Sequence, residues 1–328
     1  MRVSITYLYV IFQYGYPHSV RDVLRALPKI RKLGFRFLEM EGLGAAHLRA
    51  MYAQRKAVAA GLEDCGLHVH NFCVVDPALV SLNPARRAEA LGRFRMGAEL
   101  GAFFGCETLH LASYAPPVRY FSARPYQLGG KRGYKFANQT RVRIPADFEW
   151  QAVWDALVFS CRECAAIAAG YGKTVIMEPR VGEVICSVDS LLRLIEHVDR
   201  PNFRANFDTG HFSAQRENVV LALAKLAGKF ANIHISDNDP VNTDHLPIGD
   251  GSIDWLEFFR VLKMQKYGGY LGLDLGMSKT MERDYRKSLD RIRAIASKLR
   301  LKVEVSRATP AGPEPWFPLW PNARTAGQ

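Results

Sequence analysis

Short apolar runs alternate with amphipathic stretches along most of the chain. The runs are rich in β-branched and aromatic residues, which favour strands. The eight predicted strands are Val3 to Val10, Phe35 to Met40, His68 to Cys73, Glu107 to Ala112, Thr174 to Glu178, Phe203 to Phe207, Ile233 to Ser236 and Tyr270 to Leu275. The stretches between them carry apolar residues at helical spacing, and several end in Gly before the next strand, as helix C-caps do.

This alternation predicts an α/β fold. Eight strand–helix units in about 300 residues suit a (β/α)8 TIM barrel, with a doubly wound open sheet as the alternative. We expect one catalytic barrel over residues 1–300 and an extended tail rich in Pro and Trp over residues 301–328. The glycine-rich segment 128–135 does not indicate a nucleotide fold, because no strand precedes it and no helix opens on it.

The predicted fourth strand is followed by a long segment without clear periodicity, residues 113–148. Loops of this length are usually functional or disordered. This one holds several aromatic residues and leaves the barrel on the face where a site is expected, so it predicts a lid or a partner-binding insertion, with a mobile surface loop as the alternative. The tail carries Trp316 and Trp320 among prolines, and these rings need a surface to cover, on a partner or on the barrel itself.

The chain is basic, because 44 Lys and Arg against 32 Asp and Glu give a formal charge of +12. Such a charge could serve nucleic acid, an acidic substrate or an acidic partner. Seven basic residues lie in the long loop: Arg119, Arg124, Lys131, Arg132, Lys135, Arg141 and Arg143. A localised basic loop favours an acidic partner or an anionic phenolic substrate over a continuous nucleic-acid surface.

The sequence also predicts a cytoplasmic location. The N-terminal apolar run is interrupted by Gln13, Tyr14 and Gly15, so it indicates a buried strand rather than a signal peptide. No segment offers the roughly 18 apolar residues of a membrane span. The cysteines, including Cys161 and Cys164 on one face of a predicted helix, are expected to be structural thiols rather than disulfides or a zinc site.

Polar residues collect at the C-terminal ends of the predicted strands, where TIM barrels carry their functional groups. They are Glu39, Glu41, His70, His110, Glu178, Asp208, His211, His234, Asp237 and Asp274. Any one of them could be a helix cap or a hydrogen-bonded core residue. Glu178, Asp208, His234 and Asp274, however, end four consecutive strands and should converge near the barrel axis. Three carboxylates and one imidazole suit Mn, Mg, Co or Zn.

The segments IMEPRVGE, FDTGH, NIHISDND, HLPIGDGSIDW and LGLDLG resemble the xylose-isomerase-like barrel superfamily, which includes sugar phosphate isomerases and epimerases, ketose 3-epimerases and AP endonucleases. The resemblance implies that Glu178, Asp208, His234 and Asp274 bind a divalent metal, with Mn expected and Mg, Co or Zn as alternatives. Most relatives have Glu at the last position. Asp274 is one methylene shorter, so the backbone must lie closer or a water must intervene.

Within this superfamily, FLEMEGLG, LHLASYAPP, MEPRVGE, GLDLG and the long aromatic loop resemble the α subunit of bacterial C-glycoside deglycosidases. This implies a lyase that pairs with a small β subunit in a hetero-oligomer and uses Mn to cleave the carbon–carbon bond of 3-oxo-C-glycosides. A base would remove the C2 proton, and the aglycone would leave by β-elimination. The resemblance and the strand-end positions assign catalytic roles to His110, His245 and Glu178, and substrate binding to His211, Arg180, His70, Glu41 and Asp237.

Two other functions share this metal site. A keto-sugar isomerase or 3-epimerase would use the same enolisation, although the Arg that ketose epimerases usually carry shortly after the metal-binding His is absent after His234. An AP-endonuclease-like nuclease would suit the positive charge and the several histidines. Thr243 stands where nucleases have another acidic ligand, and Asp274 replaces their Glu, so nucleic acid is not the expected partner.

Overall fold

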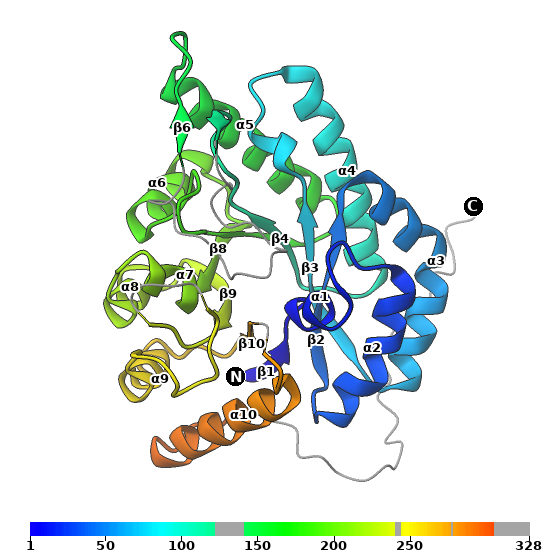
Figure 1. Cartoon of the computed structure of the whole chain (residues 1–328), viewed down its shortest axis with the longest axis vertical. Helices are drawn as coiled ribbons and strands as arrows, with labels where there is room; N and C mark the ends of the chain where they lie inside the picture. Colours follow the sequence, from blue (N-terminus) through cyan, green and yellow to red (C-terminus); the bar gives the residue numbers. More distant parts are fainter. Residues whose placement is uncertain (122–140, 240–243, 277, 305–328) are drawn as a thin grey trace, which may run out of the picture.

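The computed structural model describes residues 1–121, 141–239, 244–276 and 278–304. Eight parallel strands close into a barrel in the order β1-β10-β9-β8-β7-β4-β3-β2, with helices around it (Figure 1). The predicted TIM barrel is confirmed, and an open sheet is excluded because β1 pairs with both β2 and β10. Most of the predicted tail and the central part of the long loop lie outside the described residues.

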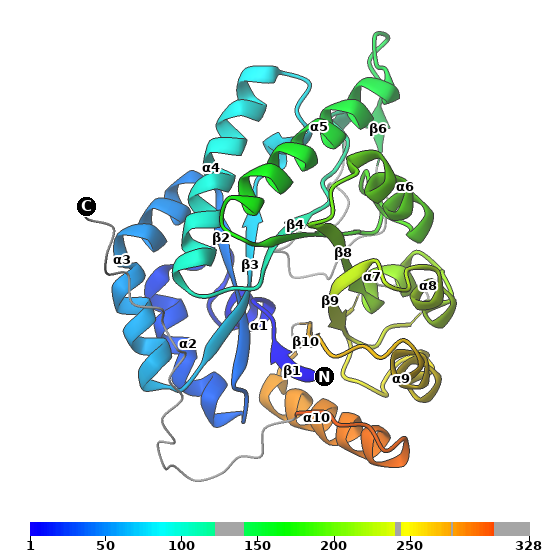
Figure 2. The ribbon, with the colours of Figure 1, turned by 180° about the vertical axis from the view of Figure 1, so that it is seen from behind.

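The barrel strands are β1 (Arg2–Ile5), β2 (Phe37–Leu43), β3 (His68–Val75), β4 (Thr108–Ala112), β7 (Thr174–Glu178), β8 (Phe203–Asp208), β9 (Phe230–Ile235) and β10 (Tyr270–Leu273). The helices are α1 (Leu8–Tyr14), α2 (Val20–Lys32), α3 (Gly44–Asp64), α4 (Pro84–Phe103), α5 (Trp150–Ala169), α6 (Val188–Val198), α7 (Thr209–Ala214), α8 (Val219–Lys225), α9 (Trp255–Met264) and α10 (Met281–Lys298). Figure 2 shows the same ring of helices from behind. No helix among the described residues is long and apolar enough to cross a membrane.

The first strand is shorter than predicted. We expected a strand from Val3 to Val10, but β1 ends at Ile5 and α1 begins at Leu8. The Tyr7 carbonyl accepts hydrogen bonds from the backbone N–H of Val10 and Ile11, which closes the first helical turn. Leu8 to Ile11 are all buried, and a fully buried apolar run has no period that separates a strand from a helix.

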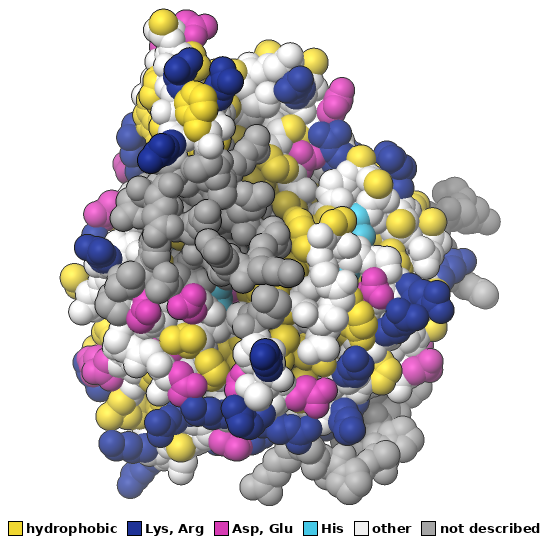
Figure 3. Space-filling model, viewed as in Figure 1, with side chains coloured by type: hydrophobic (Ala, Val, Ile, Leu, Met, Phe, Trp, Pro, Cys, Tyr) yellow, Lys and Arg dark blue, Asp and Glu magenta, His cyan; other side chains and the backbone are white. Residues whose placement is uncertain are grey.

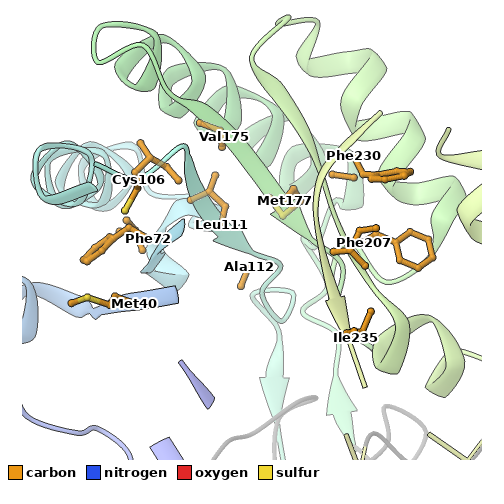
Figure 4. Close-up of a cluster of buried hydrophobic side chains, with 14 of the residues drawn as sticks. Met40, Phe72, Cys106, Leu111, Ala112, Val175, Met177, Phe207, Phe230 and Ile235 are labelled. Carbon is orange, nitrogen blue, oxygen red and sulfur yellow. The ribbon is translucent and has the colours of Figure 1, made fainter. Parts of the chain in front are cut away.

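Strand residues alternate between two environments. Leu111 on β4 and Met177 on β7 point outward into the apolar layer under the helices (Figure 4). Their neighbours His110 and Glu178 point inward from these two adjacent strands, and His110 Nε2 lies 3.6 Å from Glu178 Oε1. The barrel therefore places its apolar core outside the strands and leaves a polar interior at their C-terminal ends.

The described ends of the long loop form an arm. β5 (Arg119–Tyr120) and β6 (Val142–Arg143) pair antiparallel and project beyond the barrel (Figure 1). The Phe121 ring is 51% exposed, and the guanidinium groups of Arg119 and Arg143 lie 5.1 and 5.2 Å from its centre. Aromatic and basic side chains thus share the surface of this arm, and Lys and Arg side chains also line the edge formed by α10 (Figure 3).

We expect Gly97→Ala to destabilise the protein. A Cβ atom at Gly97 on α4 would overlap the Val74 side chain of β3, so the helix could not keep its distance from the strand. Overpacking of this kind costs about 1–3 kcal/mol, which exceeds the gain of up to about 1 kcal/mol from the better helix propensity of Ala. Thermal unfolding should show a lower Tm. Gly92→Ala in the same helix is the matched control, because nothing lies within 4 Å of its added Cβ, and it should not lower Tm.

Candidate active site

Three strands bring polar side chains together inside the C-terminal end of the barrel. Glu178 ends β7, Asp208 ends β8, and His234 on β9 pairs in register with Asp208. One possible ligand atom from each residue lies within 4.8 Å of the other two, and all three residues are buried. Three of the four residues that we expected to bind metal therefore lie in one place, which we call the metal group.

The donor atoms of the metal group fit a divalent ion. His234 Nδ1 lies 2.8 Å from Glu178 Oε1 and 3.6 Å from Asp208 Oδ2. Neither His234 Nδ1 nor Asp208 Oδ2 has a hydrogen-bond partner among the described residues, although both atoms are buried. Unpaired buried polar atoms are costly, and two carboxylates with one imidazole suit Mn, Mg, Co or Zn. These three residues could therefore hold such an ion.

Glu39 on β2 orients His234. Glu39 Oε2 lies 2.9 Å from His234 Nε2, and Asn71 and Asn232 each donate an amide N–H to the carboxylate at 3.0 Å. A carboxylate on the second ring nitrogen fixes the tautomer of a metal-binding His and raises its basicity. The sequence placed Glu39 at a strand end but gave it no role, because Glu39 meets His234 only when the barrel closes.

The charges around His234 balance one another. Burial lowers the pKa of His234, but Glu39, Asp208 and Glu178 raise it well above its usual value. Burial raises the pKa of Glu39, and His234, with smaller contributions from His70 and His110, lowers it to about 2. Without a metal, His234 is therefore cationic and Glu39 anionic near pH 7. A metal ion has to displace a proton from His234, so its affinity should rise with pH.

Two groups of described residues could hold a metal: the metal group, and a second group made of Glu39, His110 and His234. Asp274, the fourth predicted ligand, lies in neither. Thr6 Oγ1 donates to Asp274 Oδ1 at 2.6 Å, and His245 Nδ1 lies 3.0 Å from Asp274 Oδ2. Burial lowers the pKa of His245, but its hydrogen bond to Asp274 and the charge of that carboxylate raise the pKa above the usual value. The structure thus joins a predicted ligand and a predicted catalytic residue as an Asp–His pair.

His110, a predicted catalytic residue, lies beside the metal group. Asn71 Nδ2 lies 3.4 Å from His110 Nδ1, and His110 Nε2 faces Glu178. Burial lowers the pKa of His110 to about 4 although Glu178 opposes the change, so the imidazole is neutral near pH 7. Because an amide N–H occupies Nδ1, the proton of the neutral ring is on Nε2, and His110 can donate a hydrogen bond there.

Arg180 and His211, two predicted substrate-binding residues, also flank the metal group. Arg180 Nε donates to Glu178 Oε2 at 2.9 Å. The backbone N–H of His211 donates to Asp208 Oδ1 at 2.9 Å, and the His211 ring lies 5.5 Å from that of His245. Both side chains are therefore close enough to take part in binding at the metal group.

His70 lies on the N-terminal side of the metal group. Leu38 and Glu39 are consecutive on β2, but they pair with Val69 and Asn71 on β3, so His70 is an extra residue that forms a β-bulge. Because of this bulge, the side chains of both His70 and Asn71 point inward. The His70 ring stacks on Tyr270, the first residue of β10, with the ring centres 3.8 Å apart. The structure therefore does not bring His70 to the barrel mouth, where we expected it to bind substrate.

Asp237, another predicted substrate-binding residue, is fully hydrogen-bonded within the protein. Its Oδ2 accepts from the N–H of Gly249 at 2.7 Å and from Trp255 Nε1 at 2.8 Å. Its Oδ1 accepts from the N–H of Asn238 at 2.9 Å and of Ile253 at 3.2 Å. These bonds connect the loop after β9 to α9, so Asp237 has the contacts of a structural residue.

Fold and site together define the class of protein. The chain belongs to the xylose isomerase-like TIM barrel family, whose model matches residues 27–295. The L-ribulose-5-phosphate 3-epimerase UlaE of Escherichia coli (strain SMS-3-5 / SECEC) is 25% identical over 253 residues, which are 75% of this chain and 79% of the relative. UlaE of Salmonella typhi shows the same identity and coverage.

The fold also resembles solved structures of sugar epimerases. A D-tagatose 3-epimerase-like protein superimposes with a TM-score of 0.70 at 19% identity, covering 92% of this chain and 98% of the other. The 3-keto-D-glucoside 4-epimerase YcjR of E. coli, in its apo form, gives a TM-score of 0.68 at 18% identity, covering 90% and 99%. At these identities the similarity shows a shared fold.

We expect Glu39→Gln to weaken metal binding by about 10- to 100-fold, because His234 would lose the anionic partner that orients its ring. Calorimetric titration with Mn²⁺ measures the affinity. Glu107→Gln is the matched control: Glu107 accepts from the Tyr270 hydroxyl at the N-terminal end of the barrel and should leave the affinity unchanged. Equal Mn²⁺ affinity in Glu39→Gln and the wild type would show that Glu39 does not support the metal group.

Proposed function

We propose that the protein is a divalent-metal-dependent epimerase or isomerase of keto-sugars. The observation that carries the proposal is the metal group, in which Glu178, Asp208 and His234 converge with two unpaired buried donor atoms at the mouth of the barrel. The sugar epimerases among the relatives support this outcome over C-glycoside cleavage. Mn is the first metal to test.

The proposed reaction moves a proton on a carbon next to a ketone. A bound divalent ion would polarise the carbonyl and a neighbouring hydroxyl and so stabilise the enediolate. His110 would donate its Nε2–H to the developing oxyanion, which is the usual role of a neutral buried donor at such a site. Return of the proton to the same carbon gives an epimer, and return to the neighbouring carbon gives an isomer.

His245 and Glu178 are the proposed proton carriers. Asp274 lies 3.0 Å from His245 Nδ1 and fixes the orientation of the ring, and His245 would exchange the proton through Nε2, in the manner of other Asp–His pairs. Arg180 binds one oxygen of Glu178, and Asn206 donates to the other at 3.0 Å, so this carboxylate is fixed in orientation. General acid–base groups positioned in this way contribute about 10²- to 10⁴-fold to a rate.

C-deglycosylation is the second candidate, and the exposed arm supports it. Phe121 with Arg119 and Arg143 extends from the C-terminal side of β4, where a flat aromatic aglycone could rest. In this reaction the same enolisation would be followed by cleavage of the bond between the neighbouring carbon and the aryl group, whose departing carbon takes up a proton. Release of an aglycone from a 3-oxo-C-glycoside with Mn²⁺, on addition of a small partner subunit, would favour this candidate.

Hydrogen exchange in heavy water tests the proposed function. The Mn²⁺-loaded protein, incubated with free keto-sugars and 3-keto-glycosides, should incorporate deuterium at the carbon next to the carbonyl, which NMR detects together with the epimer or isomer. Removal of the metal by a chelator should stop the exchange. The proposal is wrong if the metal binds but no keto-sugar exchanges, and cleavage of an abasic-site duplex would instead indicate a nuclease.

Asp274→Asn should move the pH profile of kcat/KM. Asp274 raises the pKa of His245, and His245 accepts a proton only when it is unprotonated, so activity should rise with pH through that pKa. Without the carboxylate charge the pKa falls, and the acidic limb should move to lower pH by about 1–3 units. The maximal rate should also drop, because Asn fixes the ring less well.

His245→Asn supplies the matching test of the proton carrier. It should lower the exchange rate by about 10²-fold or more while Mn²⁺ still binds. His68→Asn, at the start of β3 and at the opposite end of the barrel, is the control and should behave as the wild type. An acidic limb that stays in place in Asp274→Asn, or full turnover in His245→Asn, would remove His245 from the reaction.

A further inference from the structure

A second polar cluster lies beside the metal group, and the reaction steps proposed above do not use it, although the sequence predicted that one of its members, Glu41, binds substrate. It consists of Glu41 on β2, His18 just before α2 and His47 in the first turn of α3. The relative exposures of these residues are 2%, 4% and 9%. The His18 and His47 rings pack edge to face with their centres 5.0 Å apart, and His18 Nδ1 lies 3.4 Å from Glu41 Oε1.

Strand geometry places Glu41 nearer the barrel mouth than Glu39, the partner of His234. Glu39 and Glu41 are two residues apart on β2, so both side chains face the interior, and Glu41 lies about 7 Å further along the strand. Its register partner on β3 is Cys73, which in turn pairs with His110 on β4. Arg180 lowers and Asp274 raises the pKa of Glu41, as expected for a cluster near the proposed reaction site.

Three polar atoms of the cluster are buried without a hydrogen-bond partner among the described residues: Glu41 Oε1, His18 Nδ1 and His47 Nε2. His47 Nδ1 accepts the backbone N–H of Leu43 at 3.3 Å, so Nε2 carries the proton of the neutral ring and is a donor. Glu41 Oε1 and His18 Nδ1 lie 3.4 Å apart but form no aligned hydrogen bond. A buried unsatisfied group typically costs about 1–3 kcal/mol, so these atoms and His47 Nε2 favour a partner from outside the chain. A hydroxyl group, which both donates and accepts, suits a carboxyl facing imidazole nitrogens.

The cluster does not suit a phosphate. Arg180 is the one buried Lys or Arg in the part of the chain that the structure describes, and it already pairs with Glu178. Burial lowers the pKa of His18 to about 4 and also lowers that of His47, so the two imidazoles are uncharged near pH 7, and burial raises the pKa of Glu41 to about 8, so its carboxyl is mostly neutral there. A buried phosphate without a cation beside it would be strongly unfavourable.

We infer that Glu41, His18 and His47 form a subsite for the hydroxyl groups of an uncharged, unphosphorylated keto-sugar, at the end of the sugar remote from the metal group. The inference rests on the proposed function, since that function supplies the keto-sugar. It also gives this protein a different class of substrate from its L-ribulose-5-phosphate 3-epimerase relatives, namely an unphosphorylated sugar instead of a sugar phosphate. The subsite binds and orients the sugar and takes no part in proton transfer.

Turnover of three related ketoses tests the subsite. The Mn²⁺-loaded wild type should use a free ketohexose at least about tenfold better in kcat/KM than its 6-phosphate, and better than its 6-deoxy analogue. Glu41→Ala should raise KM for the ketohexose about tenfold, the equivalent of one buried hydrogen bond, with little change in kcat. It should also lose the preference over the deoxy analogue, since the hydroxyl no longer has its partner.

Glu41→Gln and His18→Asn are conservative companions in case Glu41→Ala fails to fold, and equal Tm values show that the folds are intact. They should likewise raise KM and reduce the preference over the deoxy analogue. Glu107→Gln and His68→Asn make the same changes at the opposite end of the barrel and should match the wild type. The inference is overturned if the wild type prefers the 6-phosphate, or if the cluster variants keep the full preference for the free sugar over its deoxy analogue.

Binding of a hexitol separates this inference from the proposed function, because a hexitol has hydroxyl groups but cannot enolise. Calorimetry should show binding to the wild type that weakens about tenfold in Glu41→Ala. If no keto-sugar exchanges but the hexitol result holds, the proposed reaction is wrong and the hydroxyl subsite stands. Equal hexitol affinity in the two proteins would overturn the subsite.

Discussion

The contact between Glu39 and His234 is the interaction on which the interior of this barrel depends. Glu39 is buried, and a buried carboxylate is tolerated only when cations and hydrogen-bond donors surround it. His234, Asn71 and Asn232 supply those donors from strands β9 and β3. Because His234 is held by one nitrogen, its other nitrogen is aimed at Glu178 and Asp208, and the metal group follows from this orientation.

Hydrogen-bond saturation distinguishes structural from functional carboxylates in this protein. Asp237 accepts four hydrogen bonds, three from the loop after β9 and one from Trp255 of α9, and its oxygens are therefore saturated. Asp208 Oδ2 and Glu41 Oε1 are as deeply buried but have no donor among the described residues. The protein bears the cost of leaving them unpaired, and such costs are characteristic of binding sites.

In the proposed complex, the metal group and the cluster of Glu41, His18 and His47 contact different parts of the sugar. The metal group lies where β7, β8 and β9 end, and Glu41 extends the polar surface beyond Glu39 along β2. A sugar bound by its carbonyl end at one cluster would present its remaining hydroxyl groups to the other. The TIM barrel supports many reactions, so these side chains, rather than the fold, define the chemistry that this chain can perform.

The sequence by itself determined the number and order of the barrel strands and the positions of Glu178, Asp208 and His234 at strand ends, because alternation and strand direction are local properties. The prediction of one strand from Val3 to Val10 was wrong, because a run that is buried on all sides shows neither the strand period nor the helix period. Tertiary structure alone decided that Glu39 meets a residue 195 positions away and that Asp274 pairs with His245. The physical reason is that closure of the barrel, which no local pattern records, chooses the hydrogen-bond partners of buried side chains.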